Sequence, residues 1–212
     1  MCFSATSSFA AAGMLTGIGM LALLRVKRPI TYPRAVIPFG FALQQAAEGV
    51  VWITYGKADY GLVTHAASLL FLIFAMIVWP VWIPFCLTIA ERSRAQFYKL
   101  LILTLCGMAL AAYAAYLLYL FPVHVAVMCH SIAYTYGNMT FVSACIYAAA
   151  YVGVVVLPFF ISTLRGSRIF GILLSLALLV AWWAWYTTAG SVWCFFAALL
   201  SSLIVIQVYV SE

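Results

Sequence analysis

Seven long apolar windows divide the 212-residue chain, and they constrain its fold more than any other feature. The windows lie at 6–24, 35–55, 62–89, 99–120, 138–162, 169–187 and 192–210. A helix of about 20 residues crosses a hydrocarbon layer about 30 Å thick, so each window is long enough to span a bilayer. The windows are apolar on all sides and do not alternate in polarity, which excludes a β-barrel. The sequence therefore predicts an all-α fold: a polytopic membrane protein with one seven-helix transmembrane domain over residues 1–212.

The composition excludes other classes of protein. Hydrophobic residues make up 68% of the chain and charged residues 7%, whereas a soluble domain carries about 25% charged residues. An aromatic content of 17% is the opposite of the pattern in disordered chains. The formal net charge is +6, but the basic residues are scattered among short loops and do not form a stripe. We therefore expect the lipid bilayer as a partner and no nucleic acid.

The basic residues predict how the chain is oriented. Cytoplasmic loops of membrane proteins retain an excess of Lys and Arg. Nine of the ten basic residues fall in alternate loops of the predicted topology: Arg25, Lys27, Arg28, Arg34, Arg92, Arg94, Lys99, Arg165 and Arg168. Only Lys57 falls on the other side. This pattern predicts an extracytoplasmic N-terminus and a cytoplasmic C-terminus.

One acidic residue, Glu48, lies inside a window. An ionisable group in the membrane is costly, so it is expected to face the bundle interior and to have a partner. Gln44, Gln45, Glu48 and Trp52 are spaced to share one face of a helix. This polar face predicts a site for a ligand, a proton or a metal in the extracytoplasmic half of the bundle. The alternative is that Glu48 only makes hydrogen bonds between helices.

The connection at 121–137, FPVHVAVMCHSIAYTYG, is unusually apolar for a loop. We expect a short helix that begins at Pro122 and lies over the outer mouth of the bundle. In such a helix His130 and Tyr134 would be neighbours on one face. The predicted site pairs Glu48 with His130 as its titrating, catalytic residues. Gln45, Trp52, Tyr134 and Ser4 are predicted to contact the ligand.

The cysteines allow two predictions. Cys2, Glu48, His130 and Cys194 offer two thiolates, an imidazole and a carboxylate, a set that suits tetrahedral Zn²⁺. A version with three ligands and one open position would activate water. Alternatively, Cys2 and Cys194 form a disulfide, because each lies at the outer end of the first or last window, in an oxidising compartment. Cys129 is a competing partner for that disulfide.

Several segments resemble a known family. They are MCFSATSSF at 1–9, QQAAEGVVW at 44–52, WPVWIP at 79–84, HSIAY at 130–134 and SVWCFFAALLS at 191–201. Through them the chain resembles, along essentially its whole length, a bacterial family of uncharacterised integral membrane proteins, DUF6629. The resemblance implies a multi-pass protein of the bacterial inner (cytoplasmic) membrane and no particular activity.

Three functions are compatible with these features. The first is binding of a metal or an unknown small molecule or lipid at the outer polar site, including a membrane-embedded enzyme. The second is a transporter or proton-conducting protein lined by the polar face of window 35–55. The third is a structural or partner-binding bundle with a Cys2–Cys194 disulfide. We expect the first.

Overall fold

The computed structural model describes residues 4–128, 130–137 and 140–211. Five helices run without a break, and their bounds are α1 (Ala5–Arg25), α3 (Ile37–Thr54), α6 (Arg94–Leu120), α7 (Phe141–Ile161) and α8 (Ser167–Ala184). Two further segments are interrupted, namely α4 (Gly61–Leu72) with the π-helix η3 (Ile73–Val78) and α5 (Trp79–Ala90), and α9 (Ala189–Leu200) with α10 (Ser202–Ser211). Short helical turns are η1 (Pro29–Thr31), α2 (Tyr32–Ala35), η2 (Ala58–Tyr60) and η4 (Tyr186–Thr188).

The number of apolar helical segments agrees with the prediction. Within the described residues, seven are long and apolar enough to cross a membrane. Their ranges are Ala5–Arg25, Pro29–Thr54, Ala58–Ala90, Arg94–Leu120, Phe141–Ile161, Ser167–Ala184 and Tyr186–Ile206. The mostly helical fold expected from the sequence is therefore confirmed.

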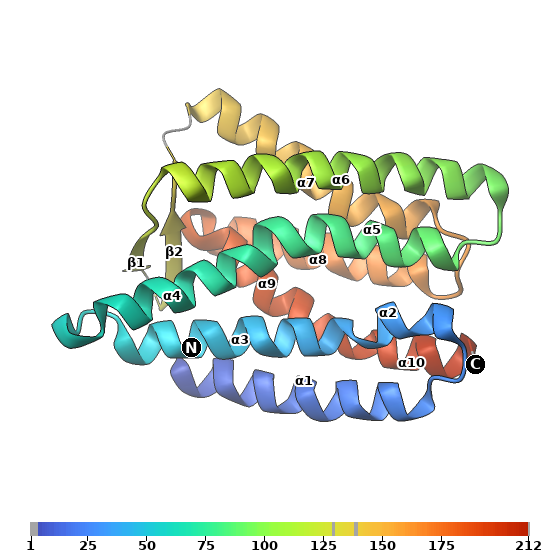
Figure 1. The fold of residues 1–212 in the computed structure, drawn as a ribbon, viewed down its shortest axis with the longest axis horizontal. Helices are drawn as coiled ribbons and strands as arrows, with labels where there is room; N and C mark the ends of the chain where they lie inside the picture. Colours follow the sequence, from blue (N-terminus) through green and yellow to red (C-terminus); the bar gives the residue numbers. More distant parts are fainter. Residues whose placement is uncertain (1–3, 129, 138–139, 212) are drawn as a thin grey trace.

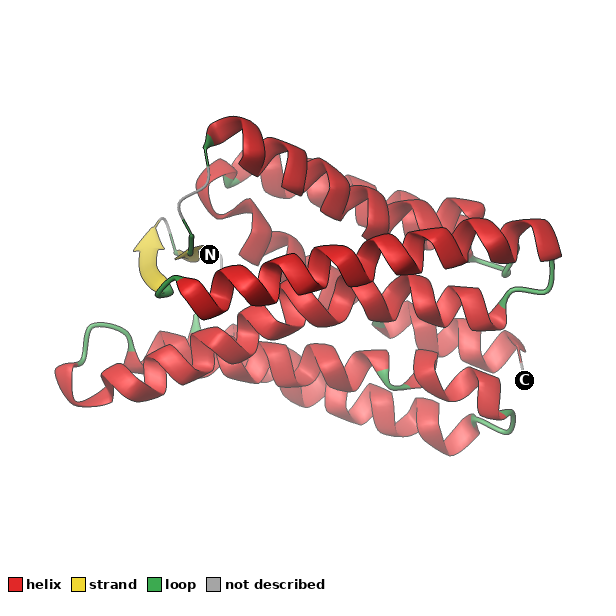
Figure 2. Ribbon diagram, turned by 45° about the horizontal axis from the view of Figure 1, so that its top comes forward, coloured by secondary structure: helices red, strands yellow, loops and turns green. Residues whose placement is uncertain are grey.

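The helices form an elongated bundle whose two ends differ chemically (Figure 1). The α1–α2, α5–α6 and α7–α8 connections lie at one end together with the C-terminal helix α10, and these connections with the helix turns beside them carry most of the basic residues. The start of α1 and a two-stranded sheet lie at the opposite end (Figure 2). Helix α1 packs against α3 and α10, and α5 packs against α6 and α7.

The connection between α6 and α7 is a β-hairpin, so the helix predicted over 121–137 is wrong. Strand β1 (His124–Met128) pairs antiparallel with β2 (Ser131–Thr135), with Val125 opposite Tyr134. Half-buried and exposed residues alternate along β1, which is the period of a strand and not of a helix. His130 adopts a positive φ of 59° in the turn, so His130 and Tyr134 are not neighbours on a helical face.

Pro80 accounts for the π-helix before α5. A proline inside a helix has no N–H to donate, and its ring clashes with the carbonyl four residues earlier. The backbone widens over η3, and the Tyr151 hydroxyl donates a hydrogen bond of 2.5 Å to the Ala75 carbonyl there. Helix α6 crosses at Gly107, where an added Cβ would lie 1.9 Å from the Pro80 carbonyl oxygen. The absence of a side chain at Gly107 therefore allows the two backbones to touch.

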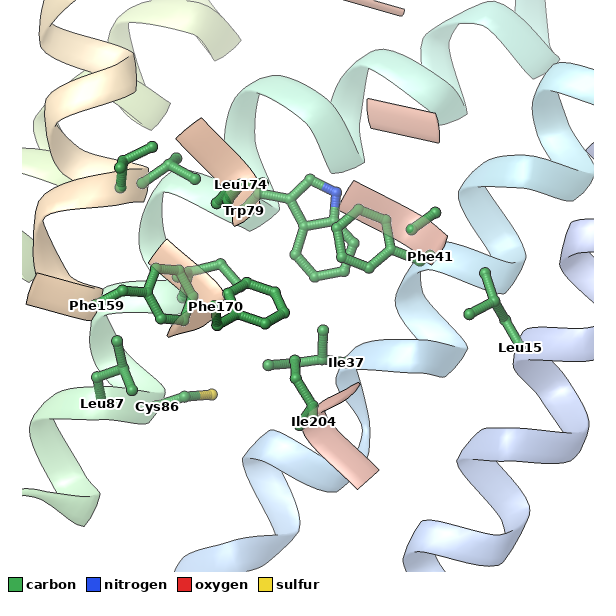
Figure 3. Packing of buried hydrophobic residues seen from close by; sticks show 14 of the residues in the cluster. Leu15, Ile37, Phe41, Trp79, Cys86, Leu87, Phe159, Phe170, Leu174 and Ile204 are labelled. Atoms are coloured by element: carbon green, nitrogen blue, oxygen red, sulfur yellow. The ribbon is translucent and has the colours of Figure 1, made fainter. Parts of the chain in front are cut away.

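The middle of the bundle is an apolar core (Figure 3). Trp79 stacks on Phe41 with ring centroids 4.0 Å apart, and Phe159 packs on Phe170 at 4.6 Å. Leu15, Ile37 and Ile204 extend this cluster toward the helices of the two chain ends.

Candidate functional site

Polar side chains of α3 are buried towards the hairpin end of the bundle. Gln44 and Gln45 are completely buried and Glu48 is 2% exposed. Trp79 Nε1 donates a hydrogen bond of 2.7 Å to Gln44 Oε1, and Ser191 Oγ donates one of 2.6 Å to Glu48 Oε1. Gln44, Gln45 and Glu48 are thus buried inside the bundle, as the sequence predicts.

Helix α9 forms a second wall of the site. Ser191 and Cys194 are three residues apart and both are buried, so they share the face of α9 that meets α3. Cys194 is a free thiol that packs in one apolar cluster with Ala47 and Phe71. The thiol is therefore held next to the Glu48 side chain by the packing of two helices.

The hairpin covers the site. Tyr134 of β2 stacks on Phe71, with ring centroids 4.7 Å apart and planes 15° apart. Burial raises the pKa of the Tyr134 hydroxyl well above its ordinary value, and Glu48 and Cys194 raise it further. The Tyr134 side chain is therefore within electrostatic reach of both groups.

Two further contacts fasten the hairpin to the bundle. The hydroxyls of Ser131 and Thr188 share a buried hydrogen bond of 2.6 Å. Ile132 is 1% exposed and packs with Val51 of α3 and Ala67 of α4. Together with the stacking of Tyr134 on Phe71, these contacts hold the hairpin against the end of the bundle that contains Glu48.

Most of the polar atoms at this site have no hydrogen-bond partner within the described protein. We use the term Glu48 site for Gln44, Gln45, Glu48, Trp52, Tyr134, Ser191 and Cys194. Six of its buried atoms are unpaired: Gln44 Nε2, Gln45 Nε2, Gln45 Oε1, Glu48 Oε2, Trp52 Nε1 and Tyr134 Oη. Leaving one such buried group unpaired costs about 1–3 kcal/mol. A concentration of them in one place is rare in native proteins and calls for a specific explanation.

A second acidic side chain, Glu91 at the opposite end, shows the contrast. Its two carboxylate oxygens accept five hydrogen bonds: from the backbone N–H of Arg92, Ser93 and Thr163, and from the hydroxyls of Ser162 and Thr163. Both carboxylate oxygens of Glu91 thus accept hydrogen bonds, whereas Oε2 of Glu48 has no hydrogen-bond partner within the described residues.

A small cavity adjoins the site on the side of the apolar core. Its volume is about 30 Å³, and Trp79, Tyr151, Trp193 and Cys194 are among the residues that line it. This volume suits one or two water molecules. The Glu48 site is therefore closely packed on this side.

Other predicted site residues lie elsewhere. Ser4 is exposed and caps α1 through reciprocal hydrogen bonds with Ser7. His130 is exposed in the hairpin turn, and no hydrogen bond or ion pair joins it to Glu48. These positions place neither Ser4 nor His130 with the buried polar cluster.

The two cysteine predictions find no support in the described part of the chain. Cys2 and Cys129 lie outside the described residues. The four described cysteines, Cys194 among them, are free thiols. No three His, Cys, Asp or Glu residues in ranges 4–128, 130–137 and 140–211 form a group that could hold a metal ion. The described members of the predicted zinc set, Glu48, His130 and Cys194, are therefore not assembled as ligands.

Sequence reasoning missed Ser191 and Phe71. Ser191 is separated from Glu48 by 143 residues, and a serine next to an apolar window carries no signal of its own. Phe71 is one of many apolar residues in its window, and only the position of the hairpin identifies it as the stacking partner of Tyr134.

Comparison with known protein families gives a match over nearly the whole chain. Residues 1–211 match the sequence pattern described as "Family of unknown function (DUF6629)". No curated protein and no solved structure matches the chain. The resemblance noted from the sequence segments is thereby confirmed.

Proposed function

The chain belongs to the family of unknown function DUF6629, and we propose that it is an integral membrane protein that binds a small polar molecule at the Glu48 site. The observation that carries this proposal is the contrast between the two carboxyl groups. Glu91 accepts five hydrogen bonds, whereas Glu48 Oε2 and five neighbouring polar atoms have none. Unsatisfied polar atoms that lower stability are typical of binding and catalytic sites, where a ligand completes the hydrogen bonds.

The proposed membrane is the bacterial inner membrane, with the Glu48 site in its outer half. Seven apolar helical segments support membrane insertion. The end that carries most of the basic residues would face the cytoplasm, because positive loops stay on that side. The hairpin would then lie on the extracytoplasmic face, and the ligand would enter from there.

We expect an epitope tag inserted after Lys57 to bind antibody in intact spheroplasts. A tag inserted after Gly166 is expected to bind only after permeabilisation, because that loop lies between Arg165 and Arg168. The measurement is antibody binding before and after detergent treatment. The opposite pattern of accessibility would contradict the proposed orientation.

The apolar core favours a binding site over a transport pathway. Between the Glu48 site and the basic end, the interior contains Trp79, Phe41, Phe159 and Phe170, packed ring against ring. A conducted ion or proton would need polar groups along this stretch. The site is thus more consistent with a pocket that opens at one end.

The experiment that tests the binding proposal compares two neighbouring glutamines. Gln45→Met removes two unpaired polar atoms and keeps a similar volume, so we expect it to raise the free energy of unfolding by about 1–3 kcal/mol. Gln44→Met leaves the Trp79 N–H without its acceptor, so we expect it to lower the free energy of unfolding by a similar amount, about 1–3 kcal/mol. Unfolding is followed in detergent micelles without added small molecules.

The two variants distinguish a binding site from a structural role. If Gln45 serves only to hold helices together, Gln45→Met destabilises the protein as much as Gln44→Met does. That result would contradict the proposal.

A further inference from the structure

We infer that the ligand of the Glu48 site carries a protonated primary amine, whose positive charge pairs with the Glu48 carboxylate. This inference rests on the binding function proposed above and adds the chemical class of the ligand.

The charge of the site is the first argument. Glu48 is the one acidic side chain inside the apolar windows of the sequence, and the hydrogen bond that its carboxyl group accepts comes from the neutral hydroxyl of Ser191. No ion pair to its carboxyl group is found in the described part of the chain. A buried carboxylate is stable only when it is paired and hydrogen-bonded. A cationic ligand would supply the missing charge, whereas an anionic ligand would add a second negative charge to it.

The hydrogen-bonding capacity of the site is the second argument. Three of its unpaired atoms can accept a hydrogen bond: Glu48 Oε2, Gln45 Oε1 and Tyr134 Oη. A primary ammonium group has three N–H donors, like that of a lysine side chain. The unpaired N–H groups of Gln44, Gln45 and Trp52 remain for acceptor atoms elsewhere on the ligand.

Aromatic rings beside the carboxyl group are the third argument. Trp52 lies one helical turn after Glu48 on α3, with its Nε1 buried and unpaired. Tyr134 lies across from it on the hairpin, supported by the stacked ring of Phe71. The faces of such rings attract a cation, most strongly when water is excluded. An ammonium group therefore suits this environment better than a neutral polar group of the same size.

The test uses the purified full-length protein in detergent, with methylammonium chloride as the probe. We expect methylammonium to raise the melting temperature with the logarithm of its concentration above its dissociation constant, by about 5 °C at about 20 times that constant. Sodium chloride at equal ionic strength should give no such rise. Glu48→Gln should abolish the shift, and Asp59→Asn, which removes an acidic residue from the exposed turn η2, should retain it.

Several results would overturn the inference. Absence of a methylammonium shift beyond that of sodium chloride, or persistence of the shift in Glu48→Gln, would do so. An equal shift with tetramethylammonium, which has no N–H donor, would exclude the primary amine. If acetamide gives a shift in melting temperature that Gln45→Met removes, while methylammonium gives none, the ligand is neutral and the binding function stands. If none of these probes gives a shift and Gln45→Met is destabilising, the binding function fails as well.

Discussion

Replacement of Glu91 by alanine is expected to lower the free energy of unfolding by about 3 kcal/mol. The Glu91 carboxylate joins the α5–α6 connection to the α7–α8 connection, because it accepts hydrogen bonds from Ser93 and from Ser162 and Thr163. The backbone distances are 3.0 Å from Ser93 N and 2.8 Å from Thr163 N. A hydrogen bond to a charged group contributes about 1.5–3 kcal/mol, and neighbouring bonds are not additive. The measurement is thermal or chemical unfolding in detergent micelles.

The matched control for this prediction is Asp59→Asn. Asp59 is exposed in η2 and makes no comparable network within the described residues, so its replacement should leave stability unchanged. If Glu91→Ala is as stable as Asp59→Asn, the hydrogen bonds to Glu91 do not hold the two connections together.

The contribution of Glu91 should also depend on pH. Burial opposes ionisation of this carboxyl group, but hydrogen bonds from Thr163, Ser93 and Ser162 outweigh it and lower the pKa below its ordinary value of 4.5. A group with a lowered pKa in the folded state stabilises the protein at neutral pH, and this stabilisation disappears as the pH falls through that pKa. The difference in stability between wild type and Glu91→Gln should therefore shrink below pH 4.5. A difference that stays constant down to about pH 3 would contradict the assigned role.

Gly107→Ala is expected to be the most disruptive single substitution of a glycine, with a loss of about 3 kcal/mol or more. The added Cβ would lie 1.9 Å from the carbonyl oxygen of Pro80 and 3.1 Å from Val154 Cγ1. A backbone carbonyl cannot rotate away as a side chain can, so α6 would have to move off α5. Thermal unfolding and the yield of monodisperse protein both report this effect.

Gly153→Ala provides the comparison for this substitution. Gly153 lies within α7, and the nearest atom to its added Cβ is Leu157 Cδ1 at 3.8 Å. Alanine there has space and a higher helix propensity than glycine, so stability should be unchanged or slightly higher. Equal behaviour of the two variants would show that α5 and α6 do not touch at Pro80.

The helical part of the fold could be predicted from the sequence because a membrane helix is a long local signal. The window 6–24 and helix α1 (Ala5–Arg25) differ by one residue at each end. The burial of Glu48 could be predicted for the same reason, since its spacing from Gln45 and its place within an apolar window are local properties. Each of these predictions needed only the sequence of one helix.

The remaining features depend on contacts between distant segments. The sequence predicted a helix for the hairpin because a short apolar segment such as 124–135 is compatible with either structure. The segment forms strands because β1 pairs with β2. The hydrogen bond from Ser191 to Glu48 joins α9 to α3, and no spacing in the sequence indicates it. The saturation of Glu91 likewise depends on a loop more than 70 residues away.

The most direct test of the central claim is the stability of Glu48→Met relative to wild type, measured without added ligand. The claim is that the unpaired polar atoms around Glu48 bind a ligand and do not stabilise the bundle. Because Glu48 Oε2 is buried without a partner and Ser191 supplies a single hydrogen bond to Oε1, we predict that Glu48→Met is at least as stable as wild type. A loss of stability as large as that of Glu91→Ala would contradict the claim and make Glu48 a structural residue.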